Sequence, residues 1–367
     1  MTERVLVAMS GGVDSAVAAA LLHRQGYDVI GVTLRLYTEP DEAALRSGRT
    51  CCGIEDIGDA RAAAQAIGIP HYVLNMEREF ERDVLDEFVN AYARGETPNP
   101  CLNCNQYVKF DTLLQRALAM GVDRLATGHY ARIERDGDVH RLHRAVDDEK
   151  DQSYVLYTLG QEALRRTLFP LGGMTKAETR AVAREAGLPL ADKPDSVDIC
   201  FVPGGDYREI LEQRGVRGVP GTIERPDGSV VGEHAGIAHY TVGQRRGLGV
   251  TEGERRFVTE IIPERNVIVI GGEGDLYRRT ATATDPHWVS DPPEVGEPLL
   301  ARIRYHAAEA SMRLVALDEA GFTVEFEEPV RAPAPGQAIV LYRGTEVVGG
   351  GTLRRDVPRR SPRSSVA

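Results

Sequence analysis

The chain has 367 residues, of which 42% are hydrophobic and 27% are charged, and its formal net charge is -11. This composition is typical of a globular protein with two or three domains, and the acidic balance excludes a uniformly basic nucleic-acid-binding surface, although not a local one. No apolar run approaches the ~20 residues of a membrane span and no signal-peptide pattern is present, so we expect a cytoplasmic protein with no membrane partner.

A strand, a glycine-rich turn and a helix are predicted first. The apolar run at 5–9 predicts a buried parallel strand, and the alanine-rich run at 16–22 predicts a helix. Between them, Gly11 and Gly12 let the backbone approach a ligand closely, and Asp14 and Ser15 are the expected helix N-caps. Because a helix start attracts anions, the turn predicts a phosphate site. It matches neither GxxxxGK[ST] nor GxGxxG, and an ordinary glycine-rich turn is the alternative.

Strands and helices then alternate through the first half of the chain. Strands are predicted at 28–36, 71–74 and 124–127, and helices at 54–67, 79–94 and 110–120. This order predicts a parallel sheet with helices on both faces, whose ligands bind at the carboxyl ends of the strands. The turn at 10–15, Leu34 and the sequence GHY at 128–130 would lie at that edge.

The second half is predicted to be mainly β structure. A hairpin is expected around 136–138 and helices at 161–168 and 176–186, followed from about Val216 by the short alternating runs HYTVGQ, RFVTEII and NVIVIGG. A proline-rich linker is expected at 285–296, before the runs LLARIRY, MRLVAL, FTVEFEE and AIVLYRG. We therefore expect a nucleotide-binding domain with a helical extension at 1–212, a β-rich domain at 213–284, a β-barrel domain at 285–356 and a disordered basic tail at 357–367.

Five cysteines are distributed as the adjacent pair Cys51 and Cys52, the CxxC pair Cys101 and Cys104, and Cys200. An odd number in a chain expected to be cytoplasmic disfavours structural disulfides and suggests thiol chemistry or a metal. Buried structural thiols are the alternative for any one of them. We expect Cys51 and Cys52 to be ordinary loop thiols near the turn at 10–15.

Eight motifs, in order, resemble one family. They are SGGVDS, TPNPCLNCNQYVKFD, ATGHYAR, EKDQSYVL, PLGGMTKAETR, DSVDICF, HYTVGQRRGLGV and PGQAIVLY. They resemble the tRNA-specific 2-thiouridylases of the MnmA type, which belong to the PP-loop ATP pyrophosphatase superfamily and replace O2 of the wobble uridine with sulfur. The similarity covers nearly the whole chain, except the insert around 39–49 and the basic tail.

The resemblance implies an α/β, Rossmann-like fold of the PP-loop, adenine nucleotide α-hydrolase type, followed by two small β-rich domains. It also implies that ATP with Mg²⁺ adenylates O2 of the uridine before sulfur attacks C2, since an unactivated oxygen is a poor leaving group. Asp14 is a candidate residue on the metal side, with helix capping as the equally ordinary alternative. The implied ATP contacts are Ala8, Met9, Ser10, Gly11, Gly12, Val13, Asp14, Ser15, Leu34 and Gly128.

The implied partners are a tRNA with a wobble uridine and a sulfur donor or relay protein, and we expect a monomer. Arg245 and Arg246, in a glycine-flanked loop, are further candidates for phosphate contact. A solvated surface charge is an equally good interpretation of any isolated basic residue, and a packed histidine is the alternative for His129. The implied tRNA contacts are Asn99, Pro100, Cys101, His129, Lys150, Asp151, Gln152, Arg304, Tyr305 and Gln337.

The implied catalytic residues are Cys104, as the nucleophile, and Cys200, as the carrier of a persulfide, both on active-site loops. Cys101 stands where many members have an aspartate, and a thiol with a reference pKa of ~8.5 cannot replace a carboxylate at ~3.9 as a base. Cys101, Cys104 and Cys200 could therefore bind a [4Fe-4S] cluster with one open iron. The alternatives are a cysteine persulfide with Cys101 as a bystander or resolving thiol, and a structural zinc site.

We therefore expect a tRNA-uridine 2-sulfurtransferase. The alternatives are a PP-loop ligase or amidotransferase acting on a small metabolite, and a non-catalytic RNA-binding adaptor. Cleavage of ATP to AMP and pyrophosphate in the presence of tRNA separates the three, because the ligase would ignore tRNA and the adaptor would release neither product.

Overall fold

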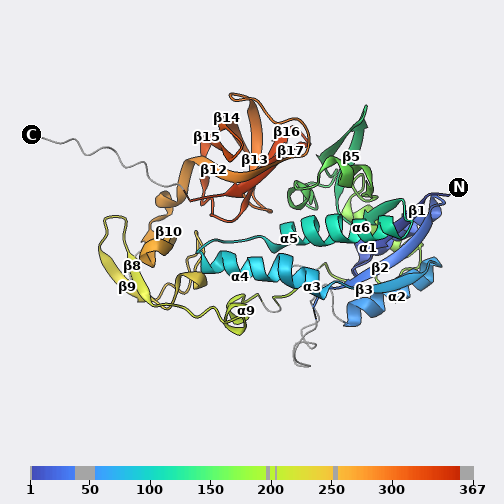
Figure 1. Cartoon of the computed structure of the whole chain (residues 1–367), viewed down its shortest axis with the longest axis horizontal. Helices are drawn as coiled ribbons and strands as arrows, with labels where there is room; N and C mark the ends of the chain where they lie inside the picture. The colour runs from blue at the N-terminus through green and yellow to red at the C-terminus, as the bar shows by residue number, and fades with distance from the viewer. Residues whose placement is uncertain (1, 38–53, 196–198, 203–204, 251–254, 356–367) are drawn as a thin grey trace, which may run out of the picture.

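A computed structural model describes residues 2–37, 54–195, 199–202, 205–250 and 255–355. An N-terminal α/β domain, a small β domain and a β-barrel follow one another along the chain (Figure 1). Cys51, Cys52, the insert at 39–49 and the tail at 357–367 lie outside the described residues. None of the helices in the described part of the chain has the length and apolar character needed to span a membrane.

A five-stranded parallel sheet organises the N-terminal domain. Its strands are β1 (Arg4–Ala8), β2 (Asp28–Arg35), β3 (His71–Asn75), β4 (Arg124–Thr127) and β7 (Thr167–Leu168), in the order β3-β2-β1-β4-β7. Ala8 lies opposite Val32 on one side and Thr127 on the other, so the carboxyl ends of the central strands meet at one edge, as predicted. The fifth strand was not predicted. Helix α7 (Gln161–Arg165) ends early, and Thr167–Leu168 pair with β4, so the helix predicted at 161–168 is wrong at its end.

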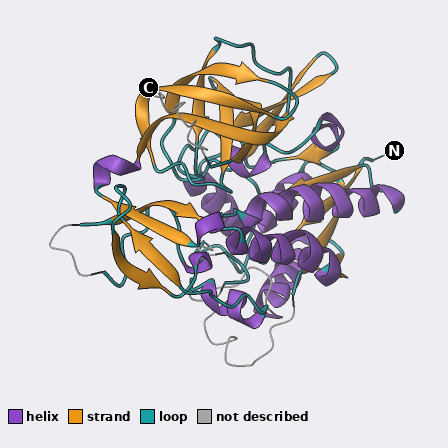
Figure 2. Cartoon of the chain, turned by 60° about the vertical axis from the view of Figure 1, so that its left-hand side comes forward, coloured by secondary structure: helices purple, strands orange, loops and turns teal. Residues whose placement is uncertain are grey.

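Helices cover both faces of the sheet because alternate residues of β1 point to opposite sides. Val5 and Val7 belong to a core cluster with α1 (Val13–Arg24), α2 (Ile54–Ile67) and α8 (Lys176–Glu185). Leu6 belongs to a second cluster, formed with the helical segments 77–93 and 100–119. The resemblance-based prediction of a Rossmann-like domain is therefore confirmed, and Figure 2 shows its helices grouped apart from the barrel strands.

Each of the two long helical segments contains a π-helical stretch. The first comprises α3 (Glu77–Phe80), a π-helix (Glu81–Leu85) and α4 (Asp86–Ala93), and the second comprises α5 (Pro100–Asn103), a π-helix (Cys104–Leu113) and α6 (Leu114–Ala119). The helix predicted at 110–120 thus begins ten residues earlier, at Pro100. Pro100 suits the first helical position, and the Asn99 side chain caps the helix by accepting the Cys101 N–H. Cys101 and Cys104 consequently lie on a helical segment, so the expected loop position is wrong for Cys104, whereas Cys200 lies in a turn.

The predicted hairpin is confirmed as β5 (Ala131–Asp136) and β6 (Val139–Arg144). It extends from the N-terminal domain to the barrel, where His143 pairs with Glu346. The chain then passes through a 3-10 helix (Ser153–Leu156) and, after α8, reaches α9 (Arg208–Gln213).

The small β domain has four strands in the order β10-β11-β8-β9. They are β8 (Gly221–Glu224), β9 (Val230–His234), β10 (Phe257–Ile262) and β11 (Val267–Gly271). The predicted strand HYTVGQ is wrong, because this region forms a 3-10 helix (Ile237–His239) and a turn. Gly243 there has a φ of 90°, which a strand does not accommodate.

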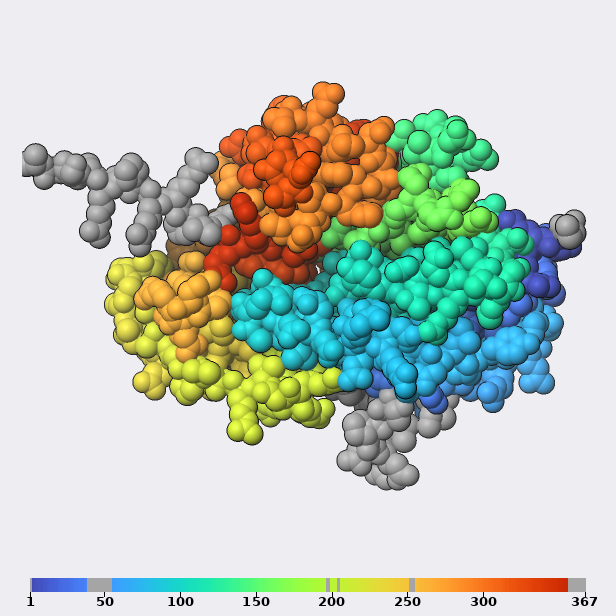
Figure 3. Space-filling view, viewed as in Figure 1, coloured from blue at the N-terminus to red at the C-terminus, as the bar shows by residue number. Residues whose placement is uncertain are grey.

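The C-terminal domain is a closed six-stranded barrel, in which β12 pairs with both β15 and β17. Its strands are β12 (Tyr277–Trp288), β13 (Pro298–Arg302), β14 (Ala310–Leu317), β15 (Gly321–Arg331), β16 (Ala338–Arg343) and β17 (Glu346–Leu353). Strand β12 continues through Asp285, so the linker expected to begin there is wrong in its first four residues. Figure 3 shows the orange and red barrel above the cyan and teal surface of the helical segments 77–93 and 100–119, the second of which carries the CxxC pair.

Candidate active site

The turn between β1 and α1 is capped by a glycine. Gly12 is the N-cap of α1, in an extended conformation and with no side-chain cap, so the prediction that Asp14 or Ser15 caps the helix is wrong. The Ser15 hydroxyl instead accepts the Ser10 N–H at 3.1 Å and donates to the Gly12 carbonyl oxygen at 3.1 Å. Because no side chain of the described residues caps the helix start through a hydrogen bond, its first N–H groups are available to an anionic ligand.

Two glycines allow backbone segments to pack against this turn. Gly11 has a φ of 77°, and a Cβ there would lie 2.4 Å from the Asp56 carbonyl oxygen of α2. A Cβ on Gly128, just after β4, would lie 2.6 Å from the Ser15 nitrogen. The predicted ATP residues of β1, α1 and β4 are therefore adjacent, while Leu34 is buried on β2, next to β1.

A network of charged side chains lies beside the turn. The Lys176 ammonium lies 2.7 Å from a carboxylate oxygen of Asp14 and 2.7 Å from one of Asp195. Asp195 also accepts hydrogen bonds from Lys150 at 2.8 Å and from Arg180 at 3.1 Å. Burial alone would raise the pKa of Asp195, but the hydrogen bonds from Lys150 and Lys176 lower that pKa below its ordinary value.

A second lysine is held on another side of the turn. The Lys193 ammonium donates to the Gly11 carbonyl oxygen at 3.1 Å and contacts Asp56 at 2.7 Å and Asp59 at 2.6 Å. Sequence reasoning assigned no role to Lys176, Arg180, Lys193 or Asp195. The available signal was that Lys176 and Arg180 lie within the matched motif PLGGMTKAETR. Asp195 is the first residue of the motif DSVDICF, and Lys193 lies two residues before it.

The three described cysteines lie in two segments of the chain, with Cys101 and Cys104 on the helical segment 100–119 and Cys200 in a turn. Cys101 is exposed, Cys104 is buried and Cys200 is half-buried. The Tyr37 hydroxyl donates to the Cys200 carbonyl oxygen at 2.6 Å, and the Phe201 ring makes edge contacts with Phe80 and Phe88, with centroids 5.6 and 5.1 Å apart. Aromatic packing thus fixes the Cys200 segment against the helical segment 77–93.

The predicted cluster ligands do not form a metal site in this arrangement. Among residues 2–37, 54–195, 199–202, 205–250 and 255–355, no three histidine, cysteine or acidic side chains are grouped as metal ligands would be. Cys101, Cys104 and Cys200 are all among these residues, and the structure does not group them in this way, so the [4Fe-4S] and zinc sites stay predictions. A Mg²⁺ ion bound mainly by phosphates needs only one or two carboxylates, which Asp14 fits.

Asp151 does not fit its implied role as a tRNA contact. Its side chain is fully buried, and its carboxylate accepts the Ala145 N–H at 3.0 Å and a hydrogen bond from Arg302 of the barrel at 2.7 Å. The Ser153 hydroxyl donates to the same carboxylate at 2.9 Å. Since a buried carboxylate is stable only when its oxygens are satisfied, Asp151 joins the domains and does not face a ligand.

Other implied tRNA residues meet near the start of helix α5. The Tyr130 N–H donates to the Gln152 side chain at 3.0 Å, and the Gln337 side chain donates to the Thr97 carbonyl oxygen at 2.7 Å, two residues before Asn99. Burial, opposed by a hydrogen bond to Gln152 and reinforced by Cys101, raises the pKa of Tyr305 to about 12. The structure therefore brings Gln152, Tyr305 and Cys101 together.

The remaining candidates differ in exposure. Arg245 and Arg246 are exposed, whereas Arg304 is half-buried and donates to the Ala332 carbonyl oxygen. Loss of solvation, followed by the positive charge of Lys109, holds the pKa of His129 well below its ordinary value. The His129 Nδ1 lies 2.7 Å from the Thr127 hydroxyl, and the imidazole ring packs against Phe110 and Phe169. His129 is therefore a packed histidine that also lies one residue after Gly128, beside the turn.

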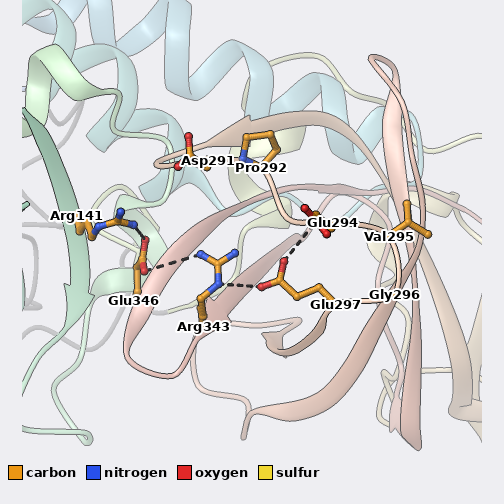
Figure 4. A pocket seen from close by; sticks show the side chains of 9 residues that line it. All are labelled: Arg141, Asp291, Pro292, Glu294, Val295, Gly296, Glu297, Arg343 and Glu346. Carbon is orange, nitrogen blue, oxygen red and sulfur yellow. Dashed lines mark hydrogen bonds and ion pairs between the residues drawn. The ribbon is translucent and has the colours of Figure 1, made fainter.

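A surface pocket of about 850 Å³ lies between the β5–β6 hairpin and the barrel (Figure 4). Four of its charged side chains form ion pairs, with Arg141 2.7 Å from Glu346 and Arg343 2.8 Å from Glu297. None of its lining residues belongs to the turn at 9–15, so we do not assign this pocket to the active site.

Comparisons with known proteins cover almost the whole chain. Residues 3–204 match the family model of a tRNA methyl transferase HUP domain, residues 208–272 a tRNA methyl transferase PRC-barrel domain, and residues 278–353 an aminomethyltransferase beta-barrel domain. The chain is 47% identical to the tRNA-specific 2-thiouridylase MnmA of Carboxydothermus hydrogenoformans, over 96% of this chain and 98% of that one. It is 49% identical to the MnmA of Chloroflexus aurantiacus, over 96% and 98% of the two chains.

Among solved structures, one of a 4-thiouridine synthetase–RNA complex with bound ATP is similar to this chain. The similar part covers 58% of this chain and 50% of the synthetase chain, with 18% identity and a TM-score of 0.34.

Proposed function

The chain belongs to the family of tRNA-specific 2-thiouridylases, and we propose that it activates the wobble uridine with ATP bound at the turn of residues 8–15. It is a tRNA-uridine 2-sulfurtransferase, as its full-length relatives are. The observation that best supports the proposed site is the glycine-capped start of α1, with the Lys176 ammonium 2.7 Å from Asp14 in its first turn. This arrangement offers N–H groups and a cation to a phosphate chain.

In the first step, O2 of the uridine attacks the α-phosphorus of ATP and pyrophosphate leaves. The α1 N–H groups and Lys176 stabilise the charge that develops on the phosphate oxygens. Asp14 would hold Mg²⁺, which supplies further charge neutralisation when it is bound. Close packing of Gly11 and Gly128 keeps the turn rigid, so that the phosphates meet groups that are already in position.

In the second step, sulfur replaces the activated oxygen. The terminal sulfur of a Cys200 persulfide attacks C2, and AMP leaves with the former O2. The Cys104 thiolate then attacks the Cys200 sulfur, which releases 2-thiouridine and leaves a Cys104–Cys200 disulfide for a thiol reductant to reopen. We favour this route because Cys101, Cys104 and Cys200 do not form a cluster site among the described residues, and Cys101 is then a bystander or resolving thiol.

The tRNA is proposed to bind across the start of α5 and the neighbouring barrel edge. Asn99, Pro100, Gln152, Arg304, Tyr305 and Gln337 supply the candidate contacts, and the exposed Arg245 and Arg246 supply phosphate contacts. A wobble base must be unstacked to reach the chemistry, and a surface made by two domains can hold both the base and its flanking backbone. We further propose that the chain acts as a monomer in the cytoplasm and receives sulfur from a donor or relay protein.

The direct test supplies purified protein with unmodified tRNA, ATP, Mg²⁺ and a persulfide donor. We expect 2-thiouridine at the wobble position and one AMP for each uridine converted. A protein that cleaves ATP equally well without tRNA would favour the small-metabolite ligase, and one that binds tRNA without cleaving ATP would favour the adaptor.

A further inference from the structure

The uridine must lose one proton in the proposed adenylation step. As O2 bonds to the α-phosphorus and pyrophosphate leaves, the N3–H bond breaks and its electron pair forms the double bond between N3 and C2. We propose that the His129 imidazole is the general base that takes this proton and later returns it. This inference rests on the proposed function, because it completes the proton balance of the same reaction.

His129 lies between the nucleotide turn and the implied tRNA contacts. The residue before it, Gly128, packs so closely on the start of α1 that a Cβ there would lie 2.6 Å from the Ser15 nitrogen. The residue after it, Tyr130, donates its backbone N–H to the Gln152 side chain at 3.0 Å. A uridine with O2 at the α-phosphorus and its base near Gln152 therefore lies beside His129. Since N3 is only two bonds from O2, its proton is presented at the same place.

Packing and a hydrogen bond fix the orientation of the imidazole. The centroid of its ring lies 6.0 Å from that of Phe110, on the π-helix that begins at Cys104, and 6.0 Å from that of Phe169. The Nδ1 atom lies 2.7 Å from the Thr127 hydroxyl oxygen, which also accepts the His129 backbone N–H at 3.3 Å. In the tautomer that donates from Nδ1 to this oxygen, the lone pair of Nε2 is left to accept a proton.

The imidazole is neutral, as a base must be before it acts. Burial, followed by the positive charge of Lys109, holds the pKa of His129 well below its ordinary value, so the ring is unprotonated at neutral pH. ATP bound at the turn brings negative charge close to His129, which opposes the effect of Lys109. The N3 proton becomes more acidic as O2 gives electron density to phosphorus, so a weak base is sufficient.

Four other ionisable side chains near the proposed site are poorer proton acceptors. Burial raises the pKa of Tyr305 to about 12, so its hydroxyl already carries a proton. A thiol such as that of Cys101 has an ordinary pKa of ~8.5 and is mostly protonated at neutral pH. The carboxylates of Asp14 and Asp151 each accept a hydrogen bond from a cationic side chain. His129 is therefore the best of these groups to receive the proton.

The same proton completes the sulfur transfer. After the Cys200 persulfide has displaced AMP, C2 is joined to Cys200 through a disulfide and keeps its double bond to N3. When the Cys104 thiolate attacks the Cys200 sulfur, the electron pair of the broken S–S bond stays on the sulfur at C2 and is shared with N3. N3 then takes the proton from the His129 imidazolium, which gives neutral 2-thiouridine and restores the base.

Single-turnover release of pyrophosphate by the full chain at saturating tRNA tests this assignment. We expect His129→Gln, which stays polar but cannot take the proton, to lower the rate by about 100-fold or more, the contribution typical of a general base. His129→Ala should lose as much, and added imidazole should restore its rate in proportion to the unprotonated fraction of the imidazole. Pyrazole, a ring of the same size but a far weaker base, should not restore it. This difference separates proton transfer from refilling of the packed space.

His23→Ala is the matched control, because His23 is exposed in the last turn of α1, and its rate should stay within about twofold of the wild type. A near-wild-type rate in His129→Gln, or a His129→Ala variant that imidazole does not restore or that pyrazole restores equally well, would overturn the assignment. So would a loss of tRNA affinity alone, with the wild-type rate at saturation. If the wild-type chain released no pyrophosphate with tRNA and ATP, the proposed function itself would fail. An active wild type with unaffected His129 variants would overturn the general base alone.

Discussion

The Lys176 ammonium donates to both carboxylate oxygens of Asp14, at 2.7 and 2.9 Å. Asp14 lies in the first turn of α1 and Lys176 is the first residue of α8, so this pair joins two helices that are 162 positions apart in the chain. The contact places a cation at the start of α1, where an incoming phosphate would bind.

Replacing Lys176 should therefore impair adenylation more than RNA binding. We expect Lys176→Ala to lower tRNA-dependent pyrophosphate release about 100-fold, the usual effect of removing one preorganised donor from a developing anion. The affinity for tRNA should stay within about twofold, because the ammonium faces the nucleotide turn and not an RNA surface. Coupled release assays and filter binding measure the two quantities. Arg184→Ala is the control, because Arg184 lies on the same helix in an exposed ion pair with Asp192, 3.0 Å away. A Lys176→Ala variant with the wild-type rate would remove this lysine from the mechanism.

Gly128 should not tolerate a side chain. In Gly128→Ala the new Cβ would lie 2.6 Å from the Ser15 nitrogen and 2.8 Å from the Asp14 carbonyl carbon, and neither backbone atom can rotate away. We expect a loss of about 1–3 kcal/mol in the free energy of unfolding, together with weaker ATP binding.

Gly58→Ala is the matched control for this substitution. Gly58 is exposed on α2, and its Cβ would meet nothing within 4 Å, so alanine should raise stability by about 0.5–1 kcal/mol. Urea unfolding and ATP titration measure both variants. Equal stability of Gly128→Ala and the wild type would show that the turn is not packed as described.

Asp151 should be required for stability. Removing this buried carboxylate leaves Arg302 with Glu309, 3.1 Å away, as its remaining charge partner, and it leaves the Ala145 N–H and the Ser153 hydroxyl without their acceptor. Asp151→Ala should therefore cost about 3 kcal/mol in unfolding free energy. Asp148→Ala is the control, because Asp148 is 76% exposed and pairs with Arg144 at the surface, where such a pair is worth about 0–1 kcal/mol. If the two substitutions cost the same, Asp151 is exposed in solution and its implied tRNA contact should be reconsidered.

The cysteine variants should separate the two chemical steps. In single turnovers with protein that has been treated with a persulfide donor, we expect Cys200→Ser, which cannot carry the persulfide, and Cys104→Ser, which can, both to lose thiolation while they keep pyrophosphate release. Cys101→Ser should thiolate within about threefold of the wild-type rate, because the persulfide route does not need its sulfur. Iron analysis of anaerobically purified protein provides the control for the cluster. If the wild-type protein held stoichiometric iron, and Cys101→Ser lost both the iron and the thiolation activity, the persulfide route would be contradicted.

The packing of His129 should make stability depend on pH. Its pKa is held well below the ordinary value in the folded state, so the unfolded chain takes up this proton first as the pH falls. The free energy of unfolding should therefore decrease below about pH 6.5. Urea unfolding from pH 8 to pH 5 gives the slope of the unfolding free energy against pH, which counts the protons taken up on unfolding. In His129→Gln this slope should be smaller than in the wild type by up to one proton. An unchanged slope would mean that His129 titrates normally.

The sequence was informative wherever local pattern and tertiary environment agree. Alternate residues of the run at 5–9 face the two helical layers, so an apolar strand at that position could only be buried. The ordered motifs led to the family because they occur at many separate points of the chain. They did not show that Lys150 and Asp151, neighbours in one motif, bind Asp195 and Arg302 in different parts of the structure.

Strand β17 shows why other elements could not be predicted. Its three consecutive glycines, at 349–351, are typical of a turn. In the barrel, a Cβ on Gly349 would lie 2.3 Å from the His287 carbonyl oxygen of β12, and one on Gly350 would lie 2.4 Å from the Ile339 carbonyl oxygen of β16. The glycines are therefore explained by closure of the barrel, a long-range contact that no local pattern reveals.

The most direct measurement of the central claim is mass spectrometry of tRNA nucleosides and adenine nucleotides from one reaction with a persulfide donor. The account predicts one AMP for each 2-thiouridine formed, and neither product above background without ATP or with the Gly11→Ala variant, whose Cβ would clash with α2 at 2.4 Å. Formation of 2-thiouridine without ATP, or at the wild-type rate by Gly11→Ala, would contradict it.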